Sequence, residues 1–225
     1  MEKMTPPTLG KRFAAELLGT YLLVTLLIVA YFMTVLSGGN SLLYGITYGA
    51  DLTVLITVFR PWSYQFNPVV SIMAFLMKGQ TLVDTGVAFL GQLLAAVLAS
   101  RTVLGITNLV ESVNAQVPTI EGSGVSNLTV TSLEGFGILL LLLVYVWGAT
   151  KKDNDFFPIL AGLSVIPGAL LTVFVSGGAL NPVRVLGPAL FDTATLSTQW
   201  VYWVGPLVAA IVVAVVMGFL LKSDK

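Results

Sequence analysis

The residues of this sequence best suited to contact a small polar molecule lie in two motifs of the same composition. The motifs are Asn67-Pro68-Val69 and Asn181-Pro182-Val183. Proline is favoured in the first turn of a helix and asparagine is a good N-cap, so each motif predicts a helix that begins at its proline. The first N–H groups of a helix lack partners and carry about half a positive charge. Two such ends would repel a cation, and each asparagine could donate a side-chain N–H to a neutral molecule. The alternative is that both asparagines only cap kinked loops.

Arg184 follows Asn181 by three residues, close to one turn along the second of these helices. A guanidinium surrounded by apolar sequence is costly unless it lines water or finds partners. We interpret Arg184 as a donor on the wall of a pore, where it would hydrogen-bond oxygen atoms and repel cations. The alternative is an arginine whose side chain extends to the membrane surface.

The chain that carries these residues has the composition of an integral membrane protein. Of its 225 residues, 56% are hydrophobic and 10% are charged, with a mean hydropathy of +0.92. A soluble domain normally carries about a quarter charged residues. Basic and acidic residues both number 11, so there is no excess charge to attract nucleic acid. Histidine and cysteine are absent, which removes the commonest metal ligand and thiolate chemistry. We expect no enzyme activity, no metal and no cofactor.

Six apolar runs are long enough to cross a bilayer, which needs roughly 20 residues. The predicted spans are 12–36, 41–60, 82–106, 130–149, 156–176 and 198–221. Two further apolar runs, 68–77 and 182–190, are too short to span and begin at the Asn-Pro pairs. The predicted fold is therefore an all-α membrane protein with six transmembrane helices and two re-entrant half-helices.

The basic residues predict the orientation of these spans. If the spans alternate, one side holds Lys3, Lys11, Arg12, Arg60, Lys78, Lys151, Lys152, Lys222 and Lys225. Only Arg101 and Arg184 lie toward the other side. We expect both termini to be cytoplasmic and the connection 107–129 to be extracellular. That connection includes a glycosylation sequon at Asn127, whose use stays open.

The two halves of the chain resemble each other, about 12–106 and 130–221. "AELLGTYLLVTLL" opens the first half and "LEGFGILLLLLVY" opens the second. Glu16 and Glu134 occupy matching positions in these two stretches. With three spans in each half, the repeats have opposite orientations, so the half-helices enter from opposite faces and meet near the midplane. We expect a single transmembrane channel domain over residues 1–225.

Four stretches together resemble the major intrinsic protein family, the aquaporins and aquaglyceroporins: "AELLGTYLLV", "GQLLAA", "NPVRVLGPALF" and "YWVGPLVAA". The resemblance implies a six-helix bundle in the cell membrane, one pore per subunit, a homotetramer and passive transport. Glu16 and Glu134 resemble the family's buried glutamates, which accept hydrogen bonds from the backbone before each half-helix. Valine replaces the usual alanine of both motifs and is bulkier, so we expect altered packing where the half-helices touch.

The resemblance also implies four positions for the narrowest point of the pore. Arg184 and Gly178 match two of them, and Ala169 matches the third. The fourth, on the second span, is Ala50 when "LTVL" is aligned and Thr47 when residues are counted back from Asn67. Water-selective members carry a histidine and an aromatic residue in this ring, and glycerol-type members carry aromatic walls. Because the matched residues are small, we expect a wide opening with one charged donor, unless Tyr48 or Phe174 narrows it.

Asp51 stands in "YGADLTVL", where the family usually has a small neutral residue. A carboxyl group in a span must pair, take up a proton or face water. One hypothesis places Asp51 near the constriction, where it would weaken the repulsion of cations by Arg184. The other places it against a polar group at a helix or subunit interface.

The sequence therefore predicts a passive channel for water and small uncharged solutes, glycerol among them, that excludes ions and protons. Its other expected partners are the lipid bilayer and copies of itself. Two alternatives stay open. One is a non-conducting structural or junction protein of the same fold, suggested by Val69 and Val183. The other is a wide channel that leaks ions or carries ammonia or metalloid acids, suggested by Asp51.

Overall fold

The fold is seen in a computed structural model that describes residues 6–108, 124–150, 154–191 and 193–222. Six helices in these ranges are long and apolar enough to cross a membrane. They are α1 (Leu9–Leu36), α2 (Ser41–Phe59), α4 (Leu82–Asn108), α5 (Asn127–Thr150), α6 (Phe157–Ser176) and α8 (Val201–Leu220), the last preceded by the 3-10 helix η1 (Thr193–Thr198). Lys3, Lys151, Lys152, Lys225 and most of the connection 107–129, which entered the predicted orientation, lie outside the described residues.

Two short helices begin at the prolines of the paired motifs. They are α3 (Pro68–Leu76) and α7 (Pro182–Ala189). The predicted all-α fold with six spans and two half-helices is thus confirmed, and the half-helices end within one residue of the predicted ranges. Three spans start three residues away from the prediction: α1 and α5 begin earlier, and α8 begins later. In α1 the Thr8 hydroxyl caps the earlier start by accepting from the Lys11 N–H at 3.3 Å.

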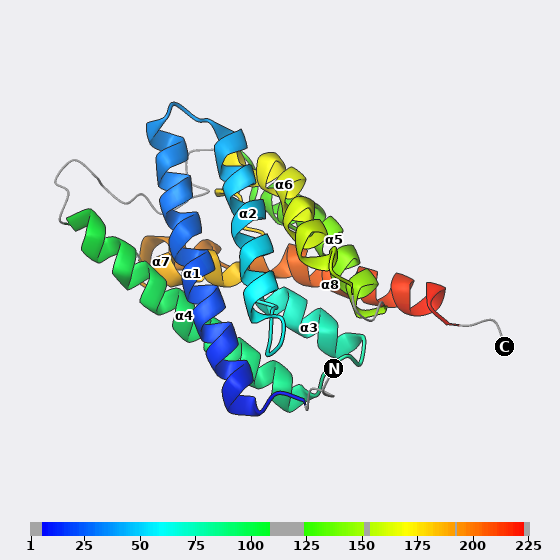
Figure 1. Ribbon diagram of the computed structural model, residues 1–225. Coiled ribbons are helices and arrows are strands. Elements are labelled where there is room, and N and C mark those ends of the chain that lie inside the picture. Colours follow the sequence, from blue (N-terminus) through cyan, green and yellow to red (C-terminus); the bar gives the residue numbers. More distant parts are fainter. Residues whose placement is uncertain (1–5, 109–123, 151–153, 192, 223–225) are drawn as a thin grey trace.

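The long helices contact one another in the order α4, α1, α2, α6, α5, α8 (Figure 1). The half-helices complete the bundle between the two ends of this series. Helix α3 contacts α4, α5 and α8, and α7 contacts α1, α4 and α8. Each half-helix is therefore held by spans from both halves of the chain, and α3 and α7 also contact each other.

Glycines allow the long helices to approach closely where they cross. A Cβ on Gly49 of α2 would lie 2.8 Å from the carbonyl oxygen of Gly162 on α6. A Cβ on Gly205 of α8 would overlap the carbonyl oxygen of Thr131 on α5. These backbones touch without intervening side chains, which is how membrane helices gain packing where lipid supplies no hydrophobic drive.

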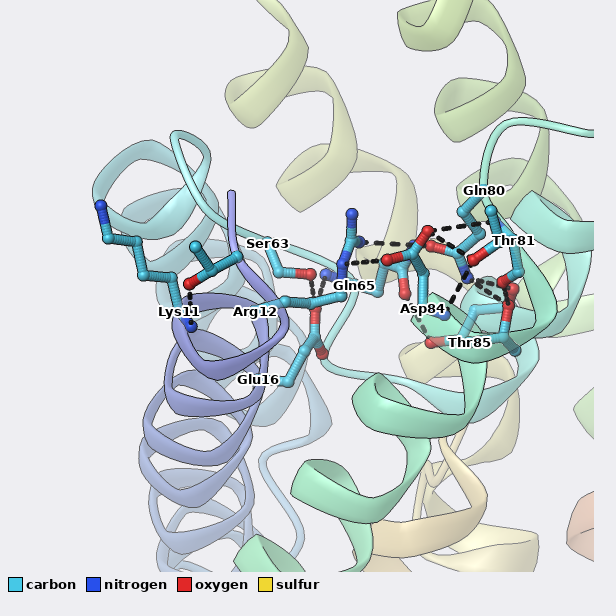
Figure 2. A network of polar contacts seen from close by, with 11 residues as sticks. Lys11, Arg12, Glu16, Ser63, Gln65, Gln80, Thr81, Asp84 and Thr85 are labelled. Atoms are coloured by element: carbon cyan, nitrogen blue, oxygen red, sulfur yellow. Dashed lines mark hydrogen bonds and ion pairs between the residues drawn. The ribbon is translucent and has the colours of Figure 1, made fainter. Parts of the chain in front are cut away.

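A buried glutamate on α1 orders the loop that leads into α3 (Figure 2). Glu16 is fully buried, and its carboxyl oxygens accept from the Ser63 hydroxyl at 2.5 Å and from the backbone N–H groups of Gln65 and Phe66, both at 2.8 Å. The Gln92 side chain on α4 adds a further donor at 2.7 Å. One carboxyl group thus supplies the acceptors that an irregular loop inside a membrane protein needs.

A chain of amides continues from this loop to the end of the bundle where α1 starts (Figure 2). Gln80 accepts from the Gln65 side chain at 2.7 Å and donates to the Ser71 carbonyl oxygen of α3 at 2.9 Å. Arg12 donates to Gln80 at 3.4 Å and forms an ion pair with Asp84 at 3.3 Å. The first half-helix is therefore tied to both α1 and α4.

Glu134 on α5 makes the corresponding contacts in the second half. It is fully buried and accepts from the Leu180 N–H at 2.7 Å, from the Ala179 N–H at 3.3 Å and from the Ser176 hydroxyl. Among the described residues it has no amide network comparable to that around Glu16. The loop before α7 consequently depends more heavily on a single carboxyl group.

Replacing Gly205 by valine should destabilise the protein. The new side chain would force α8 away from α5, and overpacking of this kind typically costs about 1–3 kcal/mol. Gly218→Val is the matched control. Gly218 lies on the same helix, and a Cβ there would meet no atom within 4 Å. Thermal unfolding in detergent should show a clearly lower midpoint for Gly205→Val; equal midpoints for the two variants would contradict the close crossing.

Replacing Glu134 by leucine should also lower stability, through polar atoms rather than packing. The substitution removes the acceptor for two buried N–H groups and a hydroxyl, and each unsatisfied group costs about 1–3 kcal/mol. Ser132→Ala is the control, because Ser132 lies two residues before Glu134 and is exposed on α5. The same unfolding measurement checks it, and a Glu134→Leu protein that melts with the control would show that the loop holds its shape without the carboxyl group.

Candidate functional site

The N-terminal ends of α3 and α7 meet inside the bundle and are joined by a reciprocal pair of hydrogen bonds. The Asn67 Nδ2 donates to the carbonyl oxygen of Leu180 at 2.8 Å, and the Asn181 Nδ2 donates to the carbonyl oxygen of Phe66 at 2.8 Å. Each asparagine is also the N-cap of its own helix. The two half-helices, far apart in the sequence, are therefore fixed end to end.

Phe66 and Leu180 have the left-handed backbone conformation that non-glycine residues rarely adopt. Their φ angles are 52° and 50°. A left-handed residue costs roughly 1–2 kcal/mol, so the surrounding contacts must compensate for it. In each case the N–H is bound by the buried glutamate and the carbonyl oxygen by the asparagine of the other half.

The side chains of the same two residues pack on glycines of the glutamate-bearing helices. The Phe66 ring lies so close to Gly19 that a Cβ there would overlap it, and a Cβ on Gly137 would lie 2.7 Å from Leu180. Any side chain at these glycines would push the strained residue out of its place. In each half, the buried glutamate, the glycine and the asparagine of the opposite half therefore all contact the same left-handed residue, Phe66 or Leu180.

The amide groups of Asn67 and Asn181 keep part of their donor capacity. An Nδ2 group carries two N–H bonds, and in each case one of them is used by the opposite loop. The oxygen of each amide accepts from the N–H of Val69 or Val183, at 3.0 and 3.3 Å. Among the described residues the second N–H of each asparagine has no partner, while both valines are fully buried.

Arg184 is almost completely buried, with 1% of its surface exposed. None of its three guanidinium nitrogens has a hydrogen-bond partner within the described ranges. Its Cζ atom lies 5.2 Å from the centre of the Tyr44 ring and 5.5 Å from that of Tyr31. The guanidinium is therefore enclosed by aromatic rings, which attract a cation, and keeps its donors unused.

Tyr44 takes the place beside Arg184 for which the sequence predicted Ala50 or Thr47. Its hydroxyl donates to the carbonyl oxygen of Gly178 at 2.8 Å, and a Cβ on Gly178 would lie 2.5 Å from its ring. Ala50 is exposed and points away from the buried face of α2, and Thr47 is half-buried and bonds to its own helix. Tyr44 therefore lies beside Arg184 on the buried face of α2, and the width of an opening there stays a prediction.

The other residues expected at the constriction divide into two groups. Ala169 is fully buried, and its carbonyl oxygen lies 3.3 Å from where a Cβ on Gly178 would stand. Tyr48 is buried one turn below Tyr44, with its hydroxyl 3.5 Å from the Ala179 carbonyl oxygen. Phe174 is 65% exposed and does not cover Arg184. Tyr48 therefore extends the aromatic wall, whereas Phe174 does not narrow the ring.

Asp51 is not brought to Arg184. It is half-buried on the flank of α2, and the only ion pair between described residues joins Arg12 to Asp84. The Asp51 Oδ2 atom is buried without a hydrogen-bond partner in the described part of the chain. No ion pair joins Asp51 to Arg184 among the described residues, and a role of Asp51 near the constriction stays a prediction.

A cavity of about 480 Å³ opens on the side of α3 where both ends of the described chain lie. Its walls include Arg12, Arg60, Gln65, Gln80 and Tyr145. The Arg60 guanidinium is held there by the Asn154 carbonyl oxygen at 2.8 Å. This cavity is lined by the same amides that anchor the first half-helix.

Sequence reasoning missed Tyr31 and Tyr44 and the amide network around Gln80. The signal for Tyr44 was its spacing from Tyr48, since residues four apart lie on one helix face. For Tyr31 there was no local signal, because its role depends on how α1 packs against α2. The glutamines stand out only as amides within or beside apolar runs.

Comparison with known proteins agrees with this geometry. A model of the family described as Major intrinsic protein matches residues 3–217. The chain is 30% identical to Aquaporin A of Dictyostelium discoideum over 224 residues, covering 95% of this chain and 79% of that protein. It is 29% identical to the Glycerol uptake facilitator protein-like 6 of Lactiplantibacillus plantarum over 212 residues, covering 91% and 95% of the two chains.

A solved structure shares the fold. The aquaglyceroporin from Plasmodium falciparum superposes with a TM-score of 0.65 at 23% identity, covering 95% of this chain and 98% of that one. At this identity the likeness concerns the fold alone. Taken with the family match over nearly the whole sequence, it leads to one assignment: this multi-pass membrane protein belongs to the major intrinsic protein family.

Proposed function

We propose that this protein is a passive channel for water and small uncharged solutes, with glycerol as the expected larger solute. The observation that carries the proposal is the meeting of the two half-helix N-termini, joined through Asn67 and Asn181. Each asparagine keeps one N–H that can donate to an oxygen atom in transit. A molecule that passes between them gives up its hydrogen bonds to water one at a time and replaces them with bonds to the channel.

Exclusion of cations follows from the charges along the same path. Both half-helices direct the positive ends of their dipoles toward the meeting point. Arg184, three residues further along α7, adds a full positive charge, and its three guanidinium nitrogens have no hydrogen-bond partner among the described residues. No carboxyl group of the described chain forms an ion pair with Arg184; the charge of Glu134 acts on it, and the oxygens of Glu134 are bound by the loop before α7.

The aromatic residues around Arg184 favour glycerol over the wide range of solutes that a ring of small residues would admit. Tyr44 presents apolar ring surface to the guanidinium, and Tyr48 packs edge to face on Tyr44 with ring centres 6.2 Å apart. A polyol offers carbon atoms on one side and hydroxyl oxygens on the other, which matches such a wall. Names among the relatives agree in kind, since they include aquaporins and a glycerol uptake facilitator.

The broader setting belongs to the same proposal. The channel would be no enzyme, would need no cofactor or metal, and would lie in the cell membrane as a homotetramer with both termini cytoplasmic. Arg12 and Arg60 line the cavity beside α3, and they support that orientation because basic residues favour the cytoplasmic side.

A second candidate is a non-conducting membrane protein of the same fold. The burial of Arg184 to 1% exposure and the complete burial of Val69 and Val183 favour it, because no solvent reaches the guanidinium in this conformation. The two candidates differ in a single property, the flux of water and solute.

Purified protein in liposomes should settle the choice by stopped-flow light scattering. Vesicles that contain the protein should shrink faster than empty vesicles in a sucrose gradient, and should re-swell faster in glycerol. A rate equal to that of empty vesicles for both water and glycerol would contradict the channel and favour the non-conducting protein.

Replacing Arg184 by alanine should weaken the exclusion of cations. Each loss of about 1.4 kcal/mol from the barrier raises a rate tenfold, so proton and potassium leak should rise by on the order of tenfold. A pH-sensitive dye inside the vesicles measures the proton leak, and a potassium-selective electrode measures the potassium leak. Arg101→Ala, an exposed arginine on α4, is the matched control. An Arg184→Ala leak no larger than that control would show that the charge is not part of the barrier.

A further inference from the structure

One of the aromatic residues that contact Arg184, Tyr31, lies on a helix that contributes none of the four positions matched to the family's constriction. The four matched positions lie on α2, on α6, in the loop before α7 and on α7. Tyr31 lies on α1, yet its ring centre is 5.5 Å from the Arg184 Cζ atom, almost as close as that of Tyr44 at 5.2 Å. The guanidinium thus lies against rings from two different spans, which also pack on each other.

The enclosure has a physical cost that these rings must offset. A buried guanidinium whose three nitrogens lack hydrogen bonds has lost its water without replacing it. Cation–π contacts recover part of that cost, more so when the contact is shielded from solvent. Tyr31 also packs edge to face on Tyr44, with ring centres 6.3 Å apart. Tyr31 therefore contributes both to the attraction of the charge and to its shielding.

The two tyrosines differ in how firmly they are held. Tyr44 is fully buried, its hydroxyl is bound to Gly178, and it packs against Tyr48 as well. Tyr31 is partly exposed, and its hydroxyl makes no hydrogen bond with any described residue. Tyr44 is a fixed wall, whereas the Tyr31 ring is held by ring contacts alone and has room on one side.

We propose that Tyr31 is a specificity-determining residue of the outer constriction, which sets the largest neutral solute that can pass Arg184. This inference rests on the proposed function. The ring, and not the hydroxyl, limits the passage, because the ring makes the contacts. Water passes when the ring shifts slightly, while a polyol of the size of glycerol requires the ring to move away from the guanidinium.

The test compares three variants in proteoliposomes by the ratio of glycerol to water permeability. Tyr31→Ala should raise this ratio several-fold, and Tyr31→Phe should keep the wild-type ratio. Phe32→Ala removes the next aromatic ring on the same helix, which has no contact with Arg184, and should leave the ratio unchanged. A Tyr31→Ala ratio equal to that of wild type overturns the inference, as does a rise of equal size in Phe32→Ala.

A second measurement does not depend on transport. Phenylglyoxal modifies accessible arginines, and mass spectrometry of peptides gives the rate at Arg184 relative to the exposed Arg101. Removal of the Tyr31 ring should speed modification of Arg184 several-fold, and Tyr31→Phe should not. An unchanged rate in Tyr31→Ala would show that this ring does not cover the guanidinium and would overturn the inference.

The two proposals fail in different ways. If wild type conducts but the Tyr31→Ala ratio stays the same, the channel stands and the role of Tyr31 is lost. If wild type passes neither water nor glycerol, the proposed function fails. Flux in Tyr31→Ala alone would then assign the block to this ring, and no flux in either protein would overturn both proposals.

Discussion

The structure depends on two residues in a strained conformation, Phe66 and Leu180. Each is held by hydrogen bonds at both its backbone N–H and its carbonyl oxygen. In each, a glutamate of the same half accepts the N–H and an asparagine of the other half donates to the carbonyl oxygen. A left-handed conformation outside glycine costs free energy, and unpaired backbone groups in a membrane cost more. Both costs are offset only when the two halves are correctly placed against each other, because the two asparagine hydrogen bonds cross between the repeats while the two glutamate bonds lie within each repeat.

The position of Arg184 follows from that coupling. Since Asn181 caps α7 and is bound to the opposite loop, the first turn of α7 is fixed in the middle of the bundle, and Arg184 lies on it. The loop before α7 also carries Gly178, on whose carbonyl oxygen Tyr44 is bound. The proposed constriction is therefore built on the same backbone that carries the asparagine. A substitution at Asn181 should therefore change the position of Arg184 and Gly178, because a short buried segment connects the three residues.

Local signals in the sequence predicted the fold well but the constriction only in part. The Asn-Pro pairs set the start of both half-helices, and the hydrophobic runs set the six spans, since capping and hydropathy act over a few residues. Which face of α2 meets Arg184 depends on how α2 packs against α1 and α6. Tyr44 instead of Ala50, and the separation of Asp51 from Arg184, are consequences of that tertiary geometry. Tyr31 is missed for the same reason, because its contact joins two helices that no motif links.

Determination of the structure in a lipid nanodisc by cryo-electron microscopy, at a resolution that defines side-chain amides, tests the central claim most directly. The account predicts that the Asn67 amide lies on the Leu180 carbonyl oxygen and the Asn181 amide on the Phe66 carbonyl oxygen, both near the 2.8 Å found here. Half-helices whose N-terminal ends stand apart, or asparagines turned away from the opposite loop, would contradict it.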